Sequence, residues 1–240
     1  MKLHNFYILV SITFCLISCK KEIQQTPGSG IQKGKSTPVI VILGSSTAAG
    51  VGATPIDSAW VNVVQATVNA SGTKAIFYNL AVEDYTTYNV MPDGSNVPPY
   101  RPAPDTANNI TKALSYKPAL VMINLPTNDI ADGYSYAEIM SNYQKLTAIL
   151  DSAKVQYIIF STQPRDFSTV SERMRLDTLN NEVIAAYANH VNNFLDQLST
   201  PTFEIDSIYS SGDGIHLNDA GHRVIANATL KQSIFINVVQ

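Results

Sequence analysis

Four short apolar runs, separated by helix-like stretches, constrain the fold more than any other feature of this chain. The run Val39-Ile40-Val41-Ile42-Leu43 shows no polar alternation, which is typical of a strand buried on both faces. Similar runs occupy residues 75–80, 120–125 and 155–160, and a weaker one occupies 203–205. Strands that alternate with helices imply βαβ units, so we expect an α/β chain with a parallel sheet covered on both sides.

The helix-like stretches complete this organisation. Ile139, Tyr143, Leu146 and Leu150 recur at helical spacing and form one apolar stripe. A longer helix is expected over 173–195 and a last one over 220–231. Because no internal repeat and no second linker interrupt the pattern, we predict a single domain over residues 38–240.

Composition excludes several classes of protein. Apolar residues make up 45% of the chain and charged residues only 15%, which excludes an intrinsically disordered protein. A net charge of −3 gives no electrostatic footprint for nucleic acid. Two Cys are too few for a disulfide scaffold, and we expect neither a metal nor another cofactor.

The N-terminus has the features of an export signal. Lys2 is followed by a largely apolar run over 6–18, which is too short to span a bilayer that requires roughly 20 residues. The run ends in Leu16-Ile17-Ser18-Cys19, which resembles the lipobox of bacterial lipoproteins.

That resemblance implies that 1–18 is a lipoprotein signal peptide and that Cys19 is acylated as the first mature residue. The alternative is an ordinary signal peptide with an incidental Cys. Residues 19–37 are polar and contain three Gly, as in a flexible tether. We therefore expect an exported protein of the cell envelope, held to a membrane only by its lipid anchor.

Candidate chemistry lies at two distant points of the sequence. The first predicted strand leads directly into Gly44-Ser45-Ser46-Thr47, where small residues allow a sharp turn that exposes a side chain. No Lys follows, so a P-loop is disfavoured. Asp213-Gly214-Ile215-His216 places a carboxylate where it can accept from Nδ1 of His216 and leave Nε2 free as a base. The other two histidines of the mature chain, His190 and His222, are interpreted as surface or packing residues.

Four segments together resemble the SGNH (GDSL-type) hydrolases. They follow the order of the four family blocks, and the resemblance extends over about 39–231. It implies a flavodoxin-like three-layer α/β/α sandwich that hydrolyses esters through a Ser-His-Asp triad. An ordinary α/β-hydrolase is disfavoured because its nucleophile lies in Gly-x-Ser-x-Gly and its acid and base are far apart. The segments are Gly44-Ser45-Ser46-Thr47, Asn79-Leu80-Ala81-Val82-Glu83-Asp84, Pro126-Thr127-Asn128-Asp129 and Asp213-Gly214-Ile215-His216-Leu217.

By this resemblance Ser46 is the nucleophile. His216 takes its proton and later protonates the leaving alcohol, while Asp213 holds the imidazole in the required tautomer. Ser45, where the family often has Asp, remains a rival nucleophile.

The resemblance also implies an oxyanion hole made of the Ser46 N–H, the Asp84 N–H and the Asn128 side chain. The family has Gly at the position of Asp84, and a carboxylate about 4 Å from an oxyanion costs about 4 kcal/mol at an effective dielectric of 20. Three alternatives follow: Asp84 points away, a cation such as Arg101 neutralises it, or the enzyme is slow or specialised.

Arg101 belongs to a proline-rich loop at 92–105, which we expect to form a wall or lid over the carboxyl ends of the strands rather than a plain surface insertion.

Two functions compete. The first is an exported serine esterase that removes acetyl or another short acyl group from a carbohydrate or other small molecule. The second is a catalytically impaired, carbohydrate-binding lipoprotein that retains the fold. A phosphodiesterase is disfavoured because clustered metal ligands and basic residues near Ser46 are missing. The sequence leaves the oligomeric state open.

Tyrosines near the strand ends either stack on sugar rings or pack in the core; they are Tyr85, Tyr88, Tyr100, Tyr134 and Tyr136.

Overall fold

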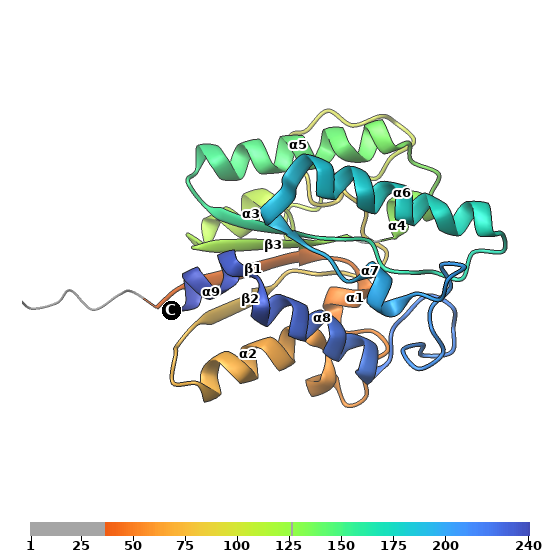
Figure 1. The fold of residues 1–240 in the computed structure, drawn as a ribbon. Helices are drawn as coiled ribbons and strands as arrows, with labels where there is room; N and C mark the ends of the chain where they lie inside the picture. The colour runs from red at the N-terminus through yellow and green to blue at the C-terminus, as the bar shows by residue number, and fades with distance from the viewer. Residues whose placement is uncertain (1–36, 126) are drawn as a thin grey trace, which may run out of the picture. The chain divides into compact units, whose positions relative to one another are not determined.

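The computed structural model describes residues 37–125 and 127–240 of the chain. Within them, five parallel strands form one sheet in the order β2-β1-β3-β4-β5 (Figure 1). The predicted signal peptide, Cys19 and nearly all of the predicted tether lie outside the described residues. The strands are β1 (Val39–Gly44), β2 (Ile76–Asn79), β3 (Leu120–Asn124), β4 (Gln156–Phe160) and β5 (Val191–Asn192).

Helices cover both faces of the sheet, which makes three layers (Figure 1). Helices α3, α5 and α6 pack on one face, and α2, α8 and α9 pack on the other. The predicted flavodoxin-like α/β/α sandwich is therefore confirmed. The helices are α1 (Ser46–Ala49), α2 (Trp60–Ala70), α3 (Ile110–Ser115), α4 (Asn128–Ala131), α5 (Tyr136–Ser152), α6 (Val170–Tyr187), α7 (Leu195–Leu198), α8 (Asp219–Lys231) and α9 (Ser233–Val239).

The central strands lack polar alternation because both of their faces are buried. Ile40 and Ile42 of β1 pack into the core beneath α2 and α8. Val41 and Leu43 pack into the opposite core, where the predicted stripe of α5 also lies. Every residue of β3 is buried as well. A continuous apolar run is therefore what this sheet position requires.

The strand order has a topological switch point between β1 and β3. From β1 the chain crosses to β2 on one side, and it then returns to place β3 on the other side. In open α/β sheets, ligands bind at the carboxyl ends of the strands at such a point. Ser46 lies two residues after the end of β1, and Asn128 follows β3. The topology therefore brings two of the predicted site residues to this crevice.

Three sequence-based predictions of elements are wrong. The fifth strand is Val191–Asn192, whereas residues 203–205 lie in a loop that makes one antiparallel bridge from Ile205 to Ser199. The helix expected over 173–195 ends at Tyr187, because Ala188 has a φ of 43° and leaves the helical conformation. Helix α8 is not the last helix, since Gln232 caps α9 through its side chain.

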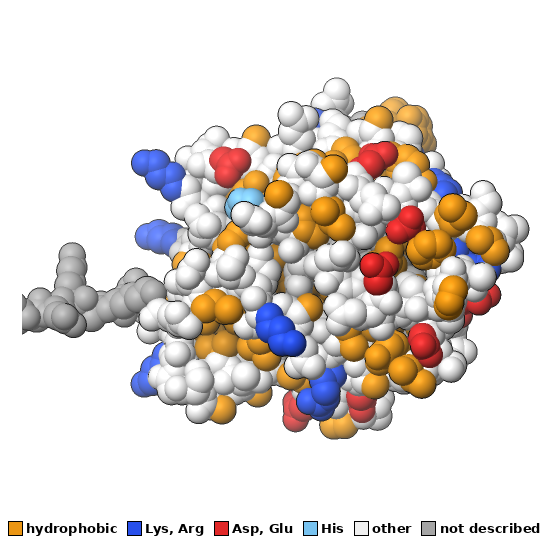
Figure 2. Space-filling model, viewed as in Figure 1, with side chains coloured by type: hydrophobic (Ala, Val, Ile, Leu, Met, Phe, Trp, Pro, Cys, Tyr) orange, Lys and Arg blue, Asp and Glu red, His pale blue; other side chains and the backbone are white. Residues whose placement is uncertain are grey.

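The surface in Figure 2 carries hydrophobic side chains in several small groups, with charged side chains dispersed among them. None of the helices in the described part of the chain has the length and apolar character needed to cross a membrane.

Candidate active site

The turn after β1 sets Ser46 at the end of the strand. A Cβ on Gly44 would lie 2.5 Å from the Ala48 Cβ and 3.0 Å from the Asn124 carbonyl oxygen, so only glycine allows this close approach. The Ser45 N–H donates to the same Asn124 carbonyl at 3.1 Å. Ser46 then begins the short helix α1, with its hydroxyl directed toward His216.

The segment 213–216 folds as a tight turn around the Asp213 carboxylate. Oδ1 accepts from the backbone N–H groups of Ile215 and His216, both at 2.8 Å. Oδ2 lies 2.6 Å from Nδ1 of His216, and Nε2 of His216 lies 3.0 Å from the Ser46 Oγ. The structure thus brings Ser46, His216 and Asp213 into one hydrogen-bonded chain.

The charge of Asp213 is stabilised by this turn. Desolvation by burial tends to raise its pKa, but the backbone N–H and ring of His216, together with the N–H of Ile215, outweigh it and lower the pKa below the usual range. An ionised carboxylate at Nδ1 favours the tautomer in which Nε2 accepts a proton from Ser46.

Two contacts lock the nucleophile turn to the His216 segment. Gly52 has a φ of 92°, and a Cβ there would lie 2.1 Å from the Leu217 carbonyl oxygen. Gln163, in the loop after β4, accepts from the Thr47 hydroxyl at 2.8 Å and donates to the Ile215 carbonyl at 3.0 Å. Gln163 therefore bridges the residue after Ser46 and the residue before His216.

The three predicted oxyanion donors lie on neighbouring elements. Asp84 has a φ of 61°, the left-handed region that favours glycine, and its side chain is exposed. Within residues 37–125 and 127–240, the N–H groups of Ser46 and Asp84 donate to no acceptor. Asn128 begins α4, and its Nδ2 donates to the Tyr85 carbonyl at 3.1 Å.

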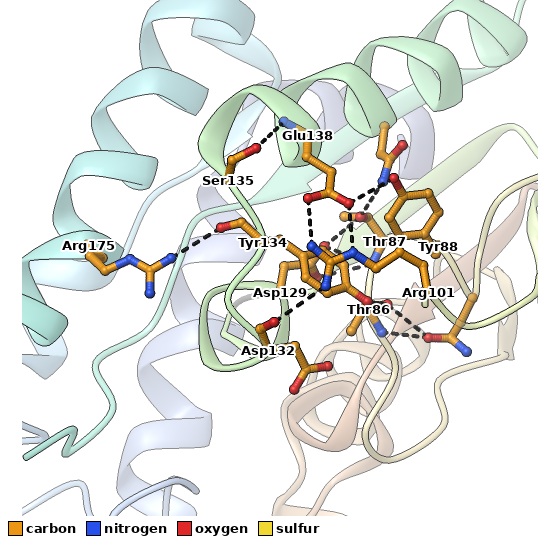
Figure 3. Close-up of polar contacts among 12 residues, drawn as sticks. Thr86, Thr87, Tyr88, Arg101, Asp129, Asp132, Tyr134, Ser135, Glu138 and Arg175 are labelled. Atoms are coloured by element: carbon orange, nitrogen blue, oxygen red, sulfur yellow. Dashed lines mark hydrogen bonds and ion pairs between the residues drawn. The ribbon is translucent and has the colours of Figure 1, made fainter. Parts of the chain in front are cut away.

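The suggested pairing of Arg101 with Asp84 is wrong. Arg101 makes a two-pronged ion pair with Glu138, with Nε to Oε1 and Nη2 to Oε2 both at 2.8 Å. Its guanidinium lies 3.5 Å from the centre of the Tyr134 ring (Figure 3). These partners hold the 92–105 loop against the start of α5, so the loop flanks the segment that follows β3.

A buried polar network surrounds Asp129, the residue that follows Asn128 in the sequence (Figure 3). The Asp129 carboxylate accepts from the Thr87 N–H at 3.0 Å and from the Thr87 hydroxyl at 2.5 Å, and Asn142 donates to that hydroxyl at 2.9 Å. Desolvation raises the pKa of Asp129 to about 7. This network ties α4 to the segment that carries Asp84.

The other two histidines pack, as the sequence predicted. His222 is fully buried; its Nδ1 accepts from the Trp60 N–H at 3.3 Å and its Nε2 donates to the Val51 carbonyl at 3.0 Å. Desolvation lowers the pKa of His222, so the ring is neutral. His190 stacks on Tyr157 with 4.1 Å between ring centres.

The tyrosines near the strand ends divide into two groups. Tyr85, Tyr88 and Tyr134 are buried and serve packing, whereas Tyr100 is 77% exposed. Tyr136 is partly buried against the core.

Three residues near the site were not identified from the sequence. Gln163 and Arg165 follow β4, and Thr87 lies beyond the block that contains Asp84. Arg165 donates from Nη1 to the Asn128 Oδ1 at 3.3 Å. The signal for Gln163 and Arg165 was that they are polar residues after the fourth apolar run, but it points to the site only once that strand is placed beside β3. In the described part of the chain, no group of three or more His, Cys, Asp or Glu could hold a metal ion.

The three-layer fold and this constellation define a hydrolase whose site lies at the carboxyl edge of a parallel sheet, distinct from the ordinary α/β-hydrolase fold. A profile of the GDSL-like lipase/acylhydrolase family matches residues 42–224, so the chain belongs to that family, whose members are carboxylic ester hydrolases. No curated protein matches the chain.

Solved structures with the same fold include three esterases or acylhydrolases. The psychrotrophic esterase EstA from Pseudoalteromonas sp. is 17% identical with a TM-score of 0.60, over 81% of this chain and 96% of that one. The lipase/acylhydrolase from Enterococcus faecalis is 18% identical with a TM-score of 0.61, over 82% and 96%. The acetyl xylan esterase AlAXEase is 14% identical with a TM-score of 0.62, over 81% and 99%.

Proposed function

We propose that this protein is a serine esterase that removes acetyl or other short acyl groups from carbohydrate through Ser46, His216 and Asp213. The observation that carries the proposal is the hydrogen-bonded chain from the Ser46 Oγ through His216 to Asp213, with heavy-atom distances of 3.0 and 2.6 Å. These distances suit proton transfer between hydroxyl and imidazole.

The mechanism follows from the positions of the donors and acceptors. Nε2 of His216 takes the Ser46 proton as Oγ attacks the ester carbonyl, and Asp213 stabilises the resulting imidazolium. The new oxyanion accepts from the N–H groups of Ser46 and Asp84 and from Nδ2 of Asn128. His216 then protonates the leaving alcohol, and the same relay activates the water that hydrolyses the acyl-enzyme.

The substrate class rests on two supports. The acetyl xylan esterase among the structures of similar fold acts on an acetylated polysaccharide by its name. The exposed Tyr100 ring, beside Arg101 at 5.1 Å, offers a flat apolar surface on the loop that flanks the segment after β3. Such a ring suits stacking against a sugar.

A hydrolysis screen tests this function. Wild type should cleave p-nitrophenyl acetate and acetylated xylo-oligosaccharides, with rates falling as the acyl chain lengthens. Ser46→Ala should lose essentially all of this activity while retaining the melting temperature of wild type. Equal hydrolysis by Ser46→Ala would reject the proposal.

Asp84 motivates the second candidate, a carbohydrate-binding lipoprotein with impaired catalysis. Its left-handed backbone and its carboxylate stand where the family has glycine. If this candidate is right, the acetylated sugars should bind by calorimetry while every ester in the screen stays intact.

We also propose that the domain is tethered to the cell envelope through acylated Cys19. The support is the sequence Leu16-Ile17-Ser18-Cys19 after a short apolar run. In a bacterial host, wild type should partition into detergent and incorporate labelled palmitate, and Cys19→Ala should do neither. Release of unlabelled wild type would reject the tether.

A further inference from the structure

We infer that Arg165 is a positioning residue of the oxyanion hole, which fixes the Asn128 amide with Nδ2 available to the developing oxyanion. The inference rests on the proposed function, because it assigns a role within the same site. It concerns a residue in the loop after β4, outside the four sequence segments that mark the family.

The chemistry of the two contacts determines how the Asn128 amide is turned. A guanidinium has only donors, so the Asn128 atom that lies 3.3 Å from the Arg165 Nη1 must be Oδ1. The Tyr85 carbonyl has only acceptor capacity, so the atom that lies 3.1 Å from it must be Nδ2. One N–H of Nδ2 is thereby used, and the second remains for the substrate.

Arg165 is suited to this role because no carboxylate engages it directly. Within residues 37–125 and 127–240, Arg165 makes no ion pair, although the carboxylates of Asp132, Asp213 and Asp84 are near enough to tend to raise its pKa. Desolvation by burial outweighs them and lowers the pKa, but an arginine stays charged at any physiological pH. A partly buried cation is thus held at the Asn128 carbonyl.

Contacts of the loop after β4 hold the backbone at Arg165 in place. The N–H of the next residue, Asp166, donates to the Gly214 carbonyl at 2.8 Å, inside the turn that carries Asp213 and His216. The Asp166 carboxylate in turn accepts from the Ile205 N–H at 2.7 Å. Because β4 pairs directly with β3, the guanidinium reaches across to Asn128 at the end of the neighbouring strand.

Two consequences follow for catalysis. First, a rotated amide would present Oδ1 to the oxyanion, and the Arg165 contact prevents this rotation. Second, a cation at Oδ1 polarises the amide and makes Nδ2–H a stronger donor. Loss of one oxyanion donor costs about 10²–10³-fold in kcat, which sets the expected scale.

The test is a double-mutant cycle with rates normalised to active sites counted by phosphonate titration. Arg165→Met should lower kcat for p-nitrophenyl acetate by about 100-fold and change KM by less than about threefold. In an Asn128→Ala background the same substitution should lower kcat by less than about threefold, because Arg165 acts through Asn128. Arg165→Lys should recover part of the loss.

Arg175→Met is the matched control. Arg175 also donates to the α4 region, but only to the backbone carbonyls of Ile130 and Tyr134, at 3.3 and 3.1 Å. This variant should keep kcat within about threefold, which shows that losing an arginine from this region is not enough to lower the rate. Equal losses from Arg165→Met in the wild-type and Asn128→Ala backgrounds, or an equal loss in Arg175→Met, would overturn the inference.

A second measurement separates this inference from the proposed function. The Asn128 side-chain amide should give two well-separated proton resonances and a high order parameter by NMR, and Arg165→Met should collapse both features. If Ser46→Ala retained full hydrolysis, the proposed function would fail. The NMR spectrum would still show whether Arg165 orders the Asn128 amide. An unchanged amide spectrum in Arg165→Met would contradict the positioning role.

Discussion

Nε2 of His216 lies 3.0 Å from Oγ of Ser46, although 170 residues separate them in the sequence. The approach is set by the fold: Ser46 follows the first strand, and the turn that carries His216 is braced against it by Gly52 and Gln163. Ser45 and Ser46 are both buried, but within the described residues it is the Ser46 hydroxyl that contacts Nε2 of His216. The geometry therefore favours Ser46 over its neighbour as nucleophile.

The first prediction concerns Asp213. Asp213→Asn keeps the shape of the side chain but no longer requires a proton on Nδ1 of His216. We expect kcat to fall by roughly 10⁴-fold with little change in KM, as in other Ser-His-Asp sites. Steady-state kinetics with p-nitrophenyl acetate measure this. A loss below about tenfold would show that Asp213 does not orient the imidazole.

The second prediction concerns Asp84. Because its side chain is exposed, solvent weakens its repulsion of the oxyanion to about 1 kcal/mol at the dielectric of water, well below the roughly 4 kcal/mol expected at an effective dielectric of 20. Asp84→Asn should therefore raise kcat by about fivefold. Asp84→Gly should match this gain and also raise stability by about 1 kcal/mol, since glycine relieves the left-handed backbone.

Kinetics and urea denaturation of both variants separate charge from backbone. A gain in kcat with Gly alone would assign the effect to backbone conformation. Reduced activity in both variants on an acetylated sugar would contradict the expected repulsion and would instead make Asp84 a substrate-binding group.

The third prediction concerns the buried Asp129. Its pKa is raised to about 7 in the folded protein from 3.8 in the unfolded chain, so between these pH values only the folded state retains the proton. This group therefore makes stability fall as the pH rises from about 4 to 7. Asp129→Asn should remove that fall and leave an acceptor for Thr87. Urea titrations from pH 4 to 8 measure it, with the exposed Asp151→Asn as control; the same slope in Asp129→Asn and wild type would contradict the prediction.

The fourth prediction concerns His222, whose effect on the pH dependence of stability is opposite to that of Asp129. Its folded pKa is lowered by burial, so below about pH 6.5 the unfolded chain binds a proton that the folded protein excludes. Stability from this group is therefore lost as the pH falls below about 6.5. His222→Gln should flatten the acid side of the stability profile, at a cost of about 1–3 kcal/mol at neutral pH for disturbed contacts with Trp60 and Val51. An acid-side slope in His222→Gln equal to that of wild type would contradict the prediction.

Strands buried on both faces were the clearest in the sequence, and the exposed edge strand β2 was also predicted, but the two-residue strand β5 and the end of α6 were not. Strands β1, β3 and β4 appear as apolar runs because each contacts helices above and below. Strand β5 has only two residues, which is too short for any periodic signal. The end of α6 at Tyr187 is marked by neither Gly nor Pro, because Ala188 itself adopts a positive φ.

The catalytic candidates could be predicted from the sequence because they lie in short, recognisable segments of the chain. Asp213 and His216 share a turn, and Ser46 lies in the turn that follows a buried strand. The contact from Arg165 to Asn128 depends instead on β4 lying beside β3, which no local pattern encodes. For the same reason the sequence suggested Arg101 as the cation near Asp84, whereas the fold engages Arg101 with Glu138.

The most direct test of the proposed mechanism is to map the site of covalent labelling by a p-nitrophenyl alkylphosphonate. We expect release of one p-nitrophenolate per active protein and an adduct on Ser46 in the digested peptide. Ser45→Ala should label at a rate close to that of wild type, while Ser46→Ala should not label and His216→Ala should label far more slowly. An adduct on Ser45, or full hydrolytic activity with no labelled serine, would contradict the mechanism.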